Sequence, residues 1–309
     1  MVGGILFFVI FIISINYNFY NLFGGMPSLQ DLEKPESELS SELYSSDNNL
    51  LGKYFRYNRS PVKFDELSDE LVTTLLVTED IRFYDHSGID LKGLVRASYG
   101  VFKNIVTFGS SGLEGGGSTI TQQLAKNLFK IRREKKGKLS GVPFLGLVIS
   151  KVKEWIVAVK LEEFYTKKEI LAMYLNTAEY GSNSYGIKVA AKTYFNKLPS
   201  ELNYNESSII VGLLNKPTKY NPYFNPDNAI EKRAEIFYNL YKYDIVNKIT
   251  YDSLKDMGLE LNYKVENQNV GQATYFRTVV RNYLINWAKE NGYDLFSDVL
   301  KIYTTIDSR

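Results

Sequence analysis

The sequence predicts a mainly α-helical protein with an apolar helix at its N-terminus. Apolar residues recur at helical spacing in several segments, and two segments carry the Thr-x-x-Gln or Thr-x-x-Glu pattern that begins a helix. No long run of alternating apolar and polar residues predicts a competing sheet. A chain of 309 residues has room for one sizeable helical core and some appendages.

The N-terminal segment predicts a membrane anchor over residues 1–23. Residues 2–15 are almost wholly apolar, and a segment rich in Tyr and Phe follows them. A helix that spans a bilayer needs about 20 apolar residues, so this run is either truncated at its start or extends through Phe23. A cleaved signal peptide is the alternative, but no basic region precedes the run and no small-x-small site follows it.

A predicted helix over residues 65–78 leads to an acidic residue. Its apolar residues recur at helical spacing, and steps of four from Leu67 arrive at Glu79. A carboxylate that is partly withdrawn from water has a raised pKa, because burial disfavours its charged form, and such a group can abstract a proton near neutral pH. The alternative is a structural acid in solvent, just past the helix end.

Another predicted helix begins at Thr119. Thr119 and Gln122 form a capping-box pattern after a run of glycines, residues 115–117. The apolar face of this helix is narrow, and the rest of its surface carries hydroxyl, amide and ammonium groups. A helix N-terminus with Lys126 two turns further on can hold an anionic group. A solvated polar face is the alternative.

Two more predicted helices carry charged residues at fixed positions. Over residues 148–159, one apolar face leaves Lys151 and Glu154 together on another face, where they can form an ion pair. Thr166 and Glu169 form a second capping-box pattern at the start of the next amphipathic helix.

Two strings of residues resemble the motifs of a known family. Residues 79–88 read E-D-I-R-F-Y-D-H-S-G, and residues 116–127 read G-G-S-T-I-T-Q-Q-L-A-K-N. At every fixed position they match the first two motifs of glycosyltransferase family 51, the peptidoglycan glycosyltransferase domain of class A penicillin-binding proteins. Residues 151–154 and 167–176 resemble the third and fourth motifs, although Ser150 stands where the family usually has arginine. Residues 229–233 match the fifth motif only loosely.

The resemblance implies a lysozyme-like helical fold and an enzyme that polymerises lipid II. Such enzymes transfer a growing glycan, carried on undecaprenyl pyrophosphate, to the sugar 4-hydroxyl of another lipid II. The reaction inverts the anomeric carbon and releases the lipid pyrophosphate. The expected location is the cell membrane, with a single-pass anchor and the catalytic domain on the outer face, periplasmic or extracellular.

The resemblance also implies a division of the chain. The expected parts are an anchor over 1–23, a stalk over 24–58, a peptidoglycan glycosyltransferase domain over 59–245 and a linker over 246–309. The linker resembles the segment that leads into a transpeptidase domain, which this sequence does not contain, so a fragment or a truncated gene product is expected.

The motif matches imply roles for individual residues. Glu79 is expected to be the base that acts on the acceptor hydroxyl, with Asp80 supporting it, and Glu154 is expected on the donor side. The residues expected to bind donor sugar and phosphate are Ser118, Thr119, Thr121, Gln122, Gln123, Lys126, Asn127, Lys151 and Lys153. The residues expected to have structural roles are Phe83, His86, Gly88 and Asn176.

The composition sets limits on metals and partners. His86 is the only histidine and the chain has no cysteine, which argues against a zinc site. A divalent ion such as Mg²⁺ or Mn²⁺ at Glu154 is left open, and no organic cofactor is expected. A net charge of +2, from 37 basic and 35 acidic residues, gives no reason to expect a nucleic-acid partner.

Two other functions are left open. A lysozyme-like lytic enzyme would also use one or two acids on glycan, but its neutral substrate has no pyrophosphate for a lysine of the second motif to hold. An inactive, membrane-tethered scaffold would account for Ser150 and for the loose fifth motif.

Overall fold

The computed structural model describes residues 2–28, 31–32, 41–54, 61–96, 99, 117–129, 131, 137–142, 144–265, 273–296, 298 and 300–309. Gly115 and Gly116, from the predicted glycine run, lie outside these residues. The prediction of a mainly helical protein is confirmed. The chain forms two compact units, Met1–Pro35 with Leu76–Tyr174, and Glu36–Leu75 with Leu175–Arg309. The domain boundaries proposed from the sequence stay predictions.

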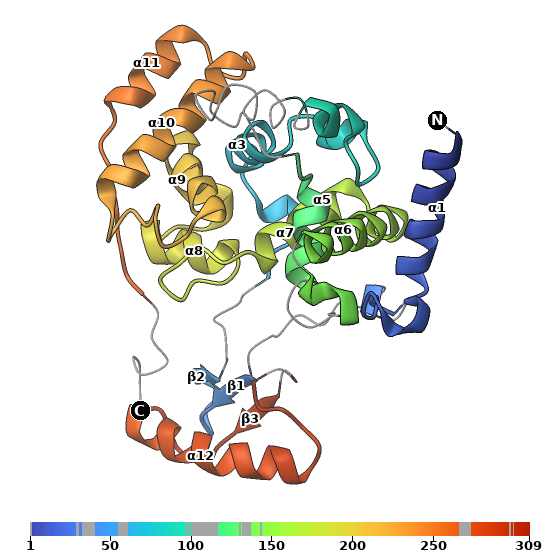
Figure 1. Ribbon diagram of the computed structural model, residues 1–309. Helices are drawn as coiled ribbons and strands as arrows, with labels where there is room; N and C mark the ends of the chain where they lie inside the picture. Colours follow the sequence, from blue (N-terminus) through green and yellow to red (C-terminus); the bar gives the residue numbers. More distant parts are fainter. Residues whose placement is uncertain are drawn as a thin grey trace. The chain divides into compact units, whose positions relative to one another are not determined.

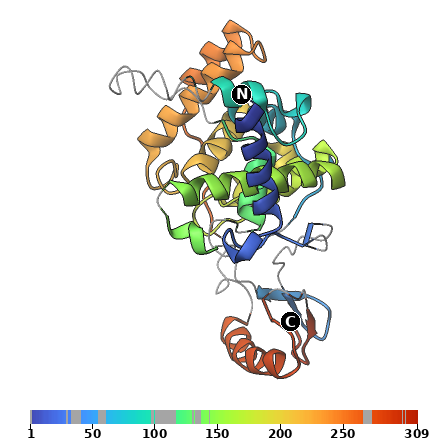
Figure 2. The same ribbon diagram turned by 45° about the vertical axis from the view of Figure 1, so that its right-hand side comes forward.

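The first unit is organised around helix α6, Leu145–Phe164. Helix α5, Ile120–Leu128, packs against α6, and helix α1, Val2–Asn16, also lies against it (Figure 1, Figure 2). The other elements with residues in this unit are η1, Phe19–Asn21; the end of α3, Asp69–Glu79; η3, Phe83–Asp85; η4, Lys138–Gly141; and most of α7, Lys167–Thr177.

Helix α6 is buried differently from the prediction. Trp155 and Ile156, on the predicted apolar face, are only partly buried and pack against a cluster that includes Ile15 of α1. The fully buried side chains include Ala158, and Glu154 is buried as well. Because both α1 and α5 pack against α6, a single apolar stripe does not describe its buried surface.

The apolar N-terminal segment forms a shorter helix than the predicted anchor. Helix α1 ends at Asn16, and Asn18 and Tyr20 adopt positive φ angles of 47° and 51°, which stop the helix before Phe23. No helix in the described part of the chain has both the length and the apolar character needed to cross a membrane. The exposed large apolar side chains of α1 include Leu6, Phe7, Val9, Ile10 and Ile13.

Helices α8 to α11 form one group of packed helices in the second unit. Helix α9, Tyr204–Asn215, contacts α8, Ile187–Phe195, and α10, Pro226–Lys242, which in turn contacts α11, Lys248–Asp256. Arg233 of α10, from the loosely matched fifth motif, is buried and donates hydrogen bonds to the Asn205 side chain and to two backbone carbonyls. These contacts give Arg233 a structural role. The short helices of this unit are η2, Phe64–Glu66, and η5, Pro199–Glu201.

A small sheet brings together two segments for which no strands were predicted. Strand β1, Ser41–Tyr44, pairs antiparallel with β2, Leu50–Tyr54, and parallel with β3, Lys301–Tyr303. Helix α12, Thr274–Glu290, packs on this sheet through a shared apolar cluster (Figure 1). The predicted stalk therefore contributes two strands, and the predicted linker contributes a third. Strands this short carry little period-two signal in the sequence.

Candidate active site

Helix α3 ends at the predicted base. The helix begins at Asp69, later than predicted, because the Ser68 hydroxyl accepts a hydrogen bond from the backbone N–H of Leu71 at 3.1 Å and caps it. Glu79 is the last residue of α3 and is half-buried. Its Oε2 accepts a hydrogen bond from Nε2 of Gln123 at 2.7 Å.

Gln123 connects this carboxylate to a tyrosine. Gln123 lies in the first turn of α5, and its Oε1 accepts a hydrogen bond from the Tyr174 hydroxyl at 2.9 Å. Tyr174 belongs to α7 and is 3% exposed. Two consecutive hydrogen bonds therefore run from a buried hydroxyl to the Glu79 carboxylate.

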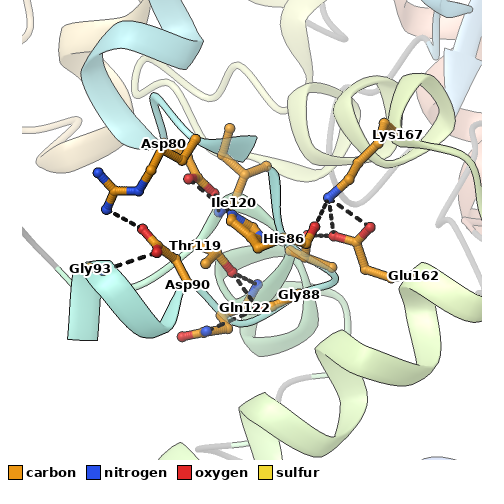
Figure 3. Close-up of polar contacts among 12 residues, drawn as sticks. Asp80, His86, Gly88, Asp90, Gly93, Thr119, Ile120, Gln122, Glu162 and Lys167 are labelled. Atoms are coloured by element: carbon orange, nitrogen blue, oxygen red, sulfur yellow. Dashed lines mark hydrogen bonds and ion pairs between the residues drawn. The ribbon is translucent and has the colours of Figure 1, made fainter. Parts of the chain in front are cut away.

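The Asp80 carboxylate lies at the N-terminus of α5 (Figure 3). Its Oδ2 accepts a hydrogen bond from the backbone N–H of Ile120 at 3.0 Å, and Nε2 of His86 lies 3.2 Å from both carboxylate oxygens. The sequence predicted that this helix N-terminus could hold an anionic group of the substrate. The anionic group found there is the Asp80 side chain of the protein itself. His86 is held in place by this contact.

Two residues at the start of α5 hold the loop of the first motif. Thr119 Oγ1 and Gln122 Nε2 both donate hydrogen bonds to the carbonyl of Gly88, at 2.8 and 3.0 Å (Figure 3). Thr119 also caps α5 by accepting from the backbone N–H of Gln122, which confirms the predicted helix start. Gly88 has a φ of +85°, and a Cβ there would lie 2.8 Å from the carbonyl carbon of Ala158. Only glycine fits this approach of the loop to α6.

An ion pair lies beside the same loop. Lys167 Nζ is 2.8 Å from Oε2 of Glu162 and donates to the His86 carbonyl at 2.6 Å (Figure 3). The same ammonium lies 4.2 Å from the centre of the Phe83 ring. Thr121 Oγ1 donates to Oε1 of Glu162 at 2.6 Å. Lys167 of α7, paired with Glu162 of α6, thus holds the backbone of the first-motif loop in place.

Three of the predicted substrate-binding residues are buried among these contacts. The exposed fractions of Thr119, Thr121 and Gln122 are 2%, 0% and 0%. Their described hydrogen bonds are with the protein, so the structure gives them positioning contacts, and their contact with substrate stays a prediction.

A second carboxylate in the loop is paired with an arginine. Asp90 accepts hydrogen bonds from the Arg82 guanidinium and, at 2.9 Å, from the backbone N–H of Gly93 (Figure 3). Burial acts to raise the pKa of Asp90, but the hydrogen bonds and the charge of Arg82 outweigh it, and the pKa is lowered from 3.8. Asp90 is therefore ionised at neutral pH and fixes the loop through Arg82.

Three of the predicted donor-side residues, Ser118, Lys151 and Glu154, form a hydrogen-bonded cluster. Lys151 Nζ donates to Ser118 Oγ at 2.7 Å and to Glu154 Oε2 at 3.0 Å, which confirms the predicted ion pair. Glu154 is 1% exposed. Because Ser118 directly precedes the α5 cap and Gln123 lies in the first turn, the Glu79 contact and the Lys151 contact both meet the start of α5.

The remaining predicted residues have different surroundings. Lys153 is 2% exposed and donates to the Gly25 carbonyl at 3.3 Å, so it lies against the segment that follows α1. Lys126 is half-buried and Asn127 is exposed near the end of α5. In the second unit, the Asn176 side chain bonds both the N–H and the C=O of Val62, at 3.0 and 2.8 Å, and so makes structural contacts.

Comparison with known proteins identifies the family of this chain. The sequence profile described as transglycosylase matches residues 47–241, which is more than half of the chain. The chain belongs to the transglycosylase family. Penicillin-binding protein 1A of Escherichia coli strain K12 is 31% identical to this chain over 281 residues, which cover 91% of this chain and 30% of the relative.

Two further comparisons are with one relative and one solved structure. Penicillin-binding protein 1A of Neisseria flavescens is 34% identical over 285 residues, which cover 92% of this chain and 33% of the relative. A crystal structure of penicillin-binding protein 1A from Haemophilus influenzae aligns with a TM-score of 0.47 at 20% identity, over 88% of this chain and 28% of the other. The chain spans about a third of the length of the curated relatives that it matches.

The donor-side cluster offers few ligands for a metal ion. The described residues contain no group of three or more His, Cys, Asp or Glu side chains that could hold one. The Glu154 carboxylate also faces the Lys151 ammonium, which supplies positive charge there. These residues do not form a metal site by themselves, and the divalent ion at Glu154 stays a prediction.

Several contacts at the site carried no signal in the sequence. Tyr174 lies in the fourth motif, but its contact with Gln123 depends on the packing of α5 and α7. Glu162 and Lys167 are five residues apart and occur on different helices, so helical spacing did not predict their ion pair. A search for polar residues on otherwise buried faces would have singled out only Tyr174.

Proposed function

We propose that this protein is a peptidoglycan glycosyltransferase that polymerises lipid II into glycan strands. The observation that carries the proposal is the meeting of two groups at the start of α5: the half-buried Glu79 carboxylate, and the Lys151 ammonium with its partner Glu154. A base and a cation are the two groups that the reaction requires. Membership of the transglycosylase family supports the same reaction class.

In the proposed reaction, Glu79 removes a proton from the acceptor. The sugar 4-hydroxyl oxygen attacks the anomeric carbon of the donor glycan, the bond from that carbon to the pyrophosphate oxygen breaks, and the anomeric centre is inverted. The hydroxyl proton passes to the Glu79 carboxylate, and undecaprenyl pyrophosphate leaves with the bonding electron pair. Gln123 holds Oε2 of Glu79 by donating a hydrogen bond to it at 2.7 Å.

Asp80 supports this reaction in a different way. Its carboxylate is 7% exposed and already accepts from the Ile120 N–H, with His86 beside it. A carboxylate with these partners is poorly placed to take a substrate proton, because its oxygens are occupied. Asp80 therefore fixes the start of α5 relative to the residue that precedes it in the chain, Glu79.

The donor side stabilises the leaving group. Lys151 is 25% exposed at its side chain and is held by Ser118 and Glu154, so its ammonium is oriented before the substrate arrives. A preoriented cation stabilises negative charge that develops on the pyrophosphate as the bond breaks. Lys126, on the same helix as Gln123, is proposed to add a second positive charge. No step is assigned to a metal ion.

The proposed location is the outer face of the cell membrane. The donor and acceptor both carry long lipid chains, so the active site must lie near the bilayer. The exposed apolar side chains of α1, among them Phe7 and Ile10, support a role for this helix in membrane attachment as the single-pass anchor or a part of it. The proposal includes a stalk over residues 24–58 and a catalytic domain on the periplasmic or extracellular side. It also includes partners from cell-wall synthesis.

The product of the reaction tests this function. The purified protein is incubated with lipid II in detergent, and separately with purified sacculi, and the products are separated by gel electrophoresis and chromatography. We expect glycan polymers from lipid II and no soluble fragments from sacculi. Release of muropeptides from sacculi without polymer would indicate a lytic enzyme, and neither product would indicate an inactive scaffold. Either result would contradict the proposal.

A further inference from the structure

We infer that Tyr174 is a positioning residue for the base Glu79 and acts through the side-chain amide of Gln123. The inference rests on the proposed function, because it assigns a role toward the proposed base. It stands on two hydrogen bonds, 2.9 Å from the Tyr174 hydroxyl to Oε1 of Gln123 and 2.7 Å from Nε2 of Gln123 to Oε2 of Glu79.

The chemistry of an amide gives this chain of bonds a direction. One end of the Gln123 side chain only accepts hydrogen bonds and the other end only donates them. A hydroxyl that donates to Oε1 keeps the NH₂ group turned toward the carboxylate. If the amide turned over, its oxygen would face the carboxylate oxygen and its NH₂ group would face the hydroxyl. The hydroxyl oxygen can also accept a hydrogen bond, so the ionised carboxylate, which only accepts, sets the orientation of the amide, and Tyr174 stabilises that orientation by donating to Oε1.

The orientation of Gln123 matters for the proton transfer. An N–H that donates to a carboxylate stabilises its ionised form, which is the form that can accept the proton of the substrate hydroxyl. Once Glu79 has taken that proton, it could donate to the oxygen of a rotated amide. By donating to Oε1, Tyr174 polarises the amide and strengthens the N–H bond to Glu79, which favours return of the base to its ionised state before the next addition.

Other charged and titratable groups lie on the elements around Glu79. On the loop of the first motif and on α5, α6 and α7, they include Asp80, Arg82, His86, Asp90, Lys126, Lys151, Glu154, Glu162 and Lys167, as well as Tyr174 itself. Substitution of Tyr174 with Phe leaves the others in place. A change in the titration of Glu79 in that variant therefore reports the link through Gln123.

The test compares Tyr174→Phe with a matched control, Tyr54→Phe. Tyr54 is 4% exposed, similar to Tyr174 at 3%, and its hydroxyl donates to the Arg277 carbonyl at 2.7 Å in the second unit. Both substitutions remove one buried hydroxyl and keep the ring. Only the first removes a bond on the path to Glu79, so the control separates the positioning role from the general cost of losing a buried hydrogen bond.

The first readout does not depend on turnover. A water-soluble carbodiimide reacts with protonated carboxyl groups, so labelling of the Glu79 peptide over a pH series, followed by mass spectrometry, gives the midpoint of protonation at that residue. We expect the midpoint to move to higher pH by up to roughly one unit in Tyr174→Phe, because a fixed hydrogen bond to the ionised form is lost. The midpoint in Tyr54→Phe stays that of the parent.

The second readout is lipid II polymerisation. We expect Tyr174→Phe to lower kcat by roughly two- to tenfold, with the KM for lipid II unchanged and with the acidic limb of the pH–rate profile moved in the same direction as the labelling midpoint. A purely structural role would lower the yield of folded enzyme and leave both pH profiles where they were.

The outcomes separate this inference from the proposed function. An unchanged labelling midpoint in folded Tyr174→Phe overturns the inference, whether or not the protein makes polymer. A shifted midpoint in a protein that makes no polymer supports the inference and contradicts the proposed function. If Tyr174→Phe does not fold, Gln123→Met, which keeps the side-chain length and removes the amide, must raise the same midpoint, and an unchanged midpoint there also overturns the inference.

Discussion

Substitution of Gly88 with Ala tests how closely the loop of the first motif approaches α6. Gly88 has a φ of +85°, and an added Cβ would lie 2.8 Å from the carbonyl carbon of Ala158, 2.9 Å from its oxygen and 3.0 Å from the backbone nitrogen of Val159. All three atoms belong to helical backbone, which cannot rotate away as the end of a side chain can. The loop must therefore move.

The expected cost has two parts. A positive φ costs a residue with a Cβ about 1–2 kcal/mol, and the smaller entropy of the unfolded chain offsets about 0.4–1 kcal/mol of this. A contact that forces packed backbone apart adds about 1–3 kcal/mol. We expect Gly88→Ala to lower the free energy of unfolding of the first unit by about 1–5 kcal/mol.

Gly292 provides the matched control. It has a φ of +76°, but no heavy atom lies within 4 Å of an added Cβ, so Gly292→Ala carries the φ cost alone. The two tryptophans report on the two substitutions separately, because Trp155 lies on α6 and Trp287 stacks on Tyr293 beside Gly292. Urea unfolding followed by fluorescence is measured in a Trp287→Phe background for Gly88 and in a Trp155→Phe background for Gly292.

The comparison of the two substitutions decides the outcome. We expect Gly292→Ala to cost about 1 kcal/mol or less, and Gly88→Ala to cost clearly more. Gly88→Ala should also lower polymerisation, because the Gly88 carbonyl accepts from both Thr119 and Gln122 at the start of α5. Equal costs at the two positions would refute the reasoning, since the contact with α6 would then contribute nothing.

Two further substitutions have expected outcomes. The pKa of Asp90 is lowered in the folded protein, so its stabilising effect is present above the unfolded value of 3.8 and is lost as the pH falls through the lower folded value. We therefore expect Asp90→Asn to be less stable than the parent in urea unfolding at about pH 7 and to approach the parent at about pH 3, and an equal difference at both pH values would argue against this. Lys151→Met leaves the buried Glu154 without this ammonium, so we expect a loss of stability together with a rise of about tenfold or more in the KM for lipid II. Adding Glu154→Gln to Lys151→Met should restore part of the stability but not the KM, and recovery of both would contradict a role for Lys151 in donor binding.

The sequence was most informative where structure depends on nearby residues. The capping pattern at Thr119 predicted the start of α5, and Thr166 with Glu169 makes the reciprocal bonds that were predicted at the start of α7, at 2.8 and 3.3 Å. Helical spacing also predicted the pair of Lys151 and Glu154. Each of these contacts spans three residues, so local geometry determines it.

Contacts between distant segments were predicted less well. The sequence placed the Glu154 side chain on a polar face of its helix, but α6 packs against both α1 and α5 and Glu154 is buried. The sequence left the N-terminus of α5 open to a substrate anion, but the Asp80 side chain reaches it from the first motif. Strands β1 and β3 pair across most of the chain length, and no pattern of a few residues can predict such a pairing.

Single-turnover polymerisation of lipid II by Glu79→Gln tests the central claim most directly. The substitution keeps the shape of the side chain and removes its basicity, and general-base catalysis typically contributes about 10²–10⁴-fold to a rate. We expect the rate at saturating lipid II to fall by about that factor while lipid II binding changes by less than about twofold. A Glu79→Gln protein that polymerises lipid II at the parent rate would contradict the account.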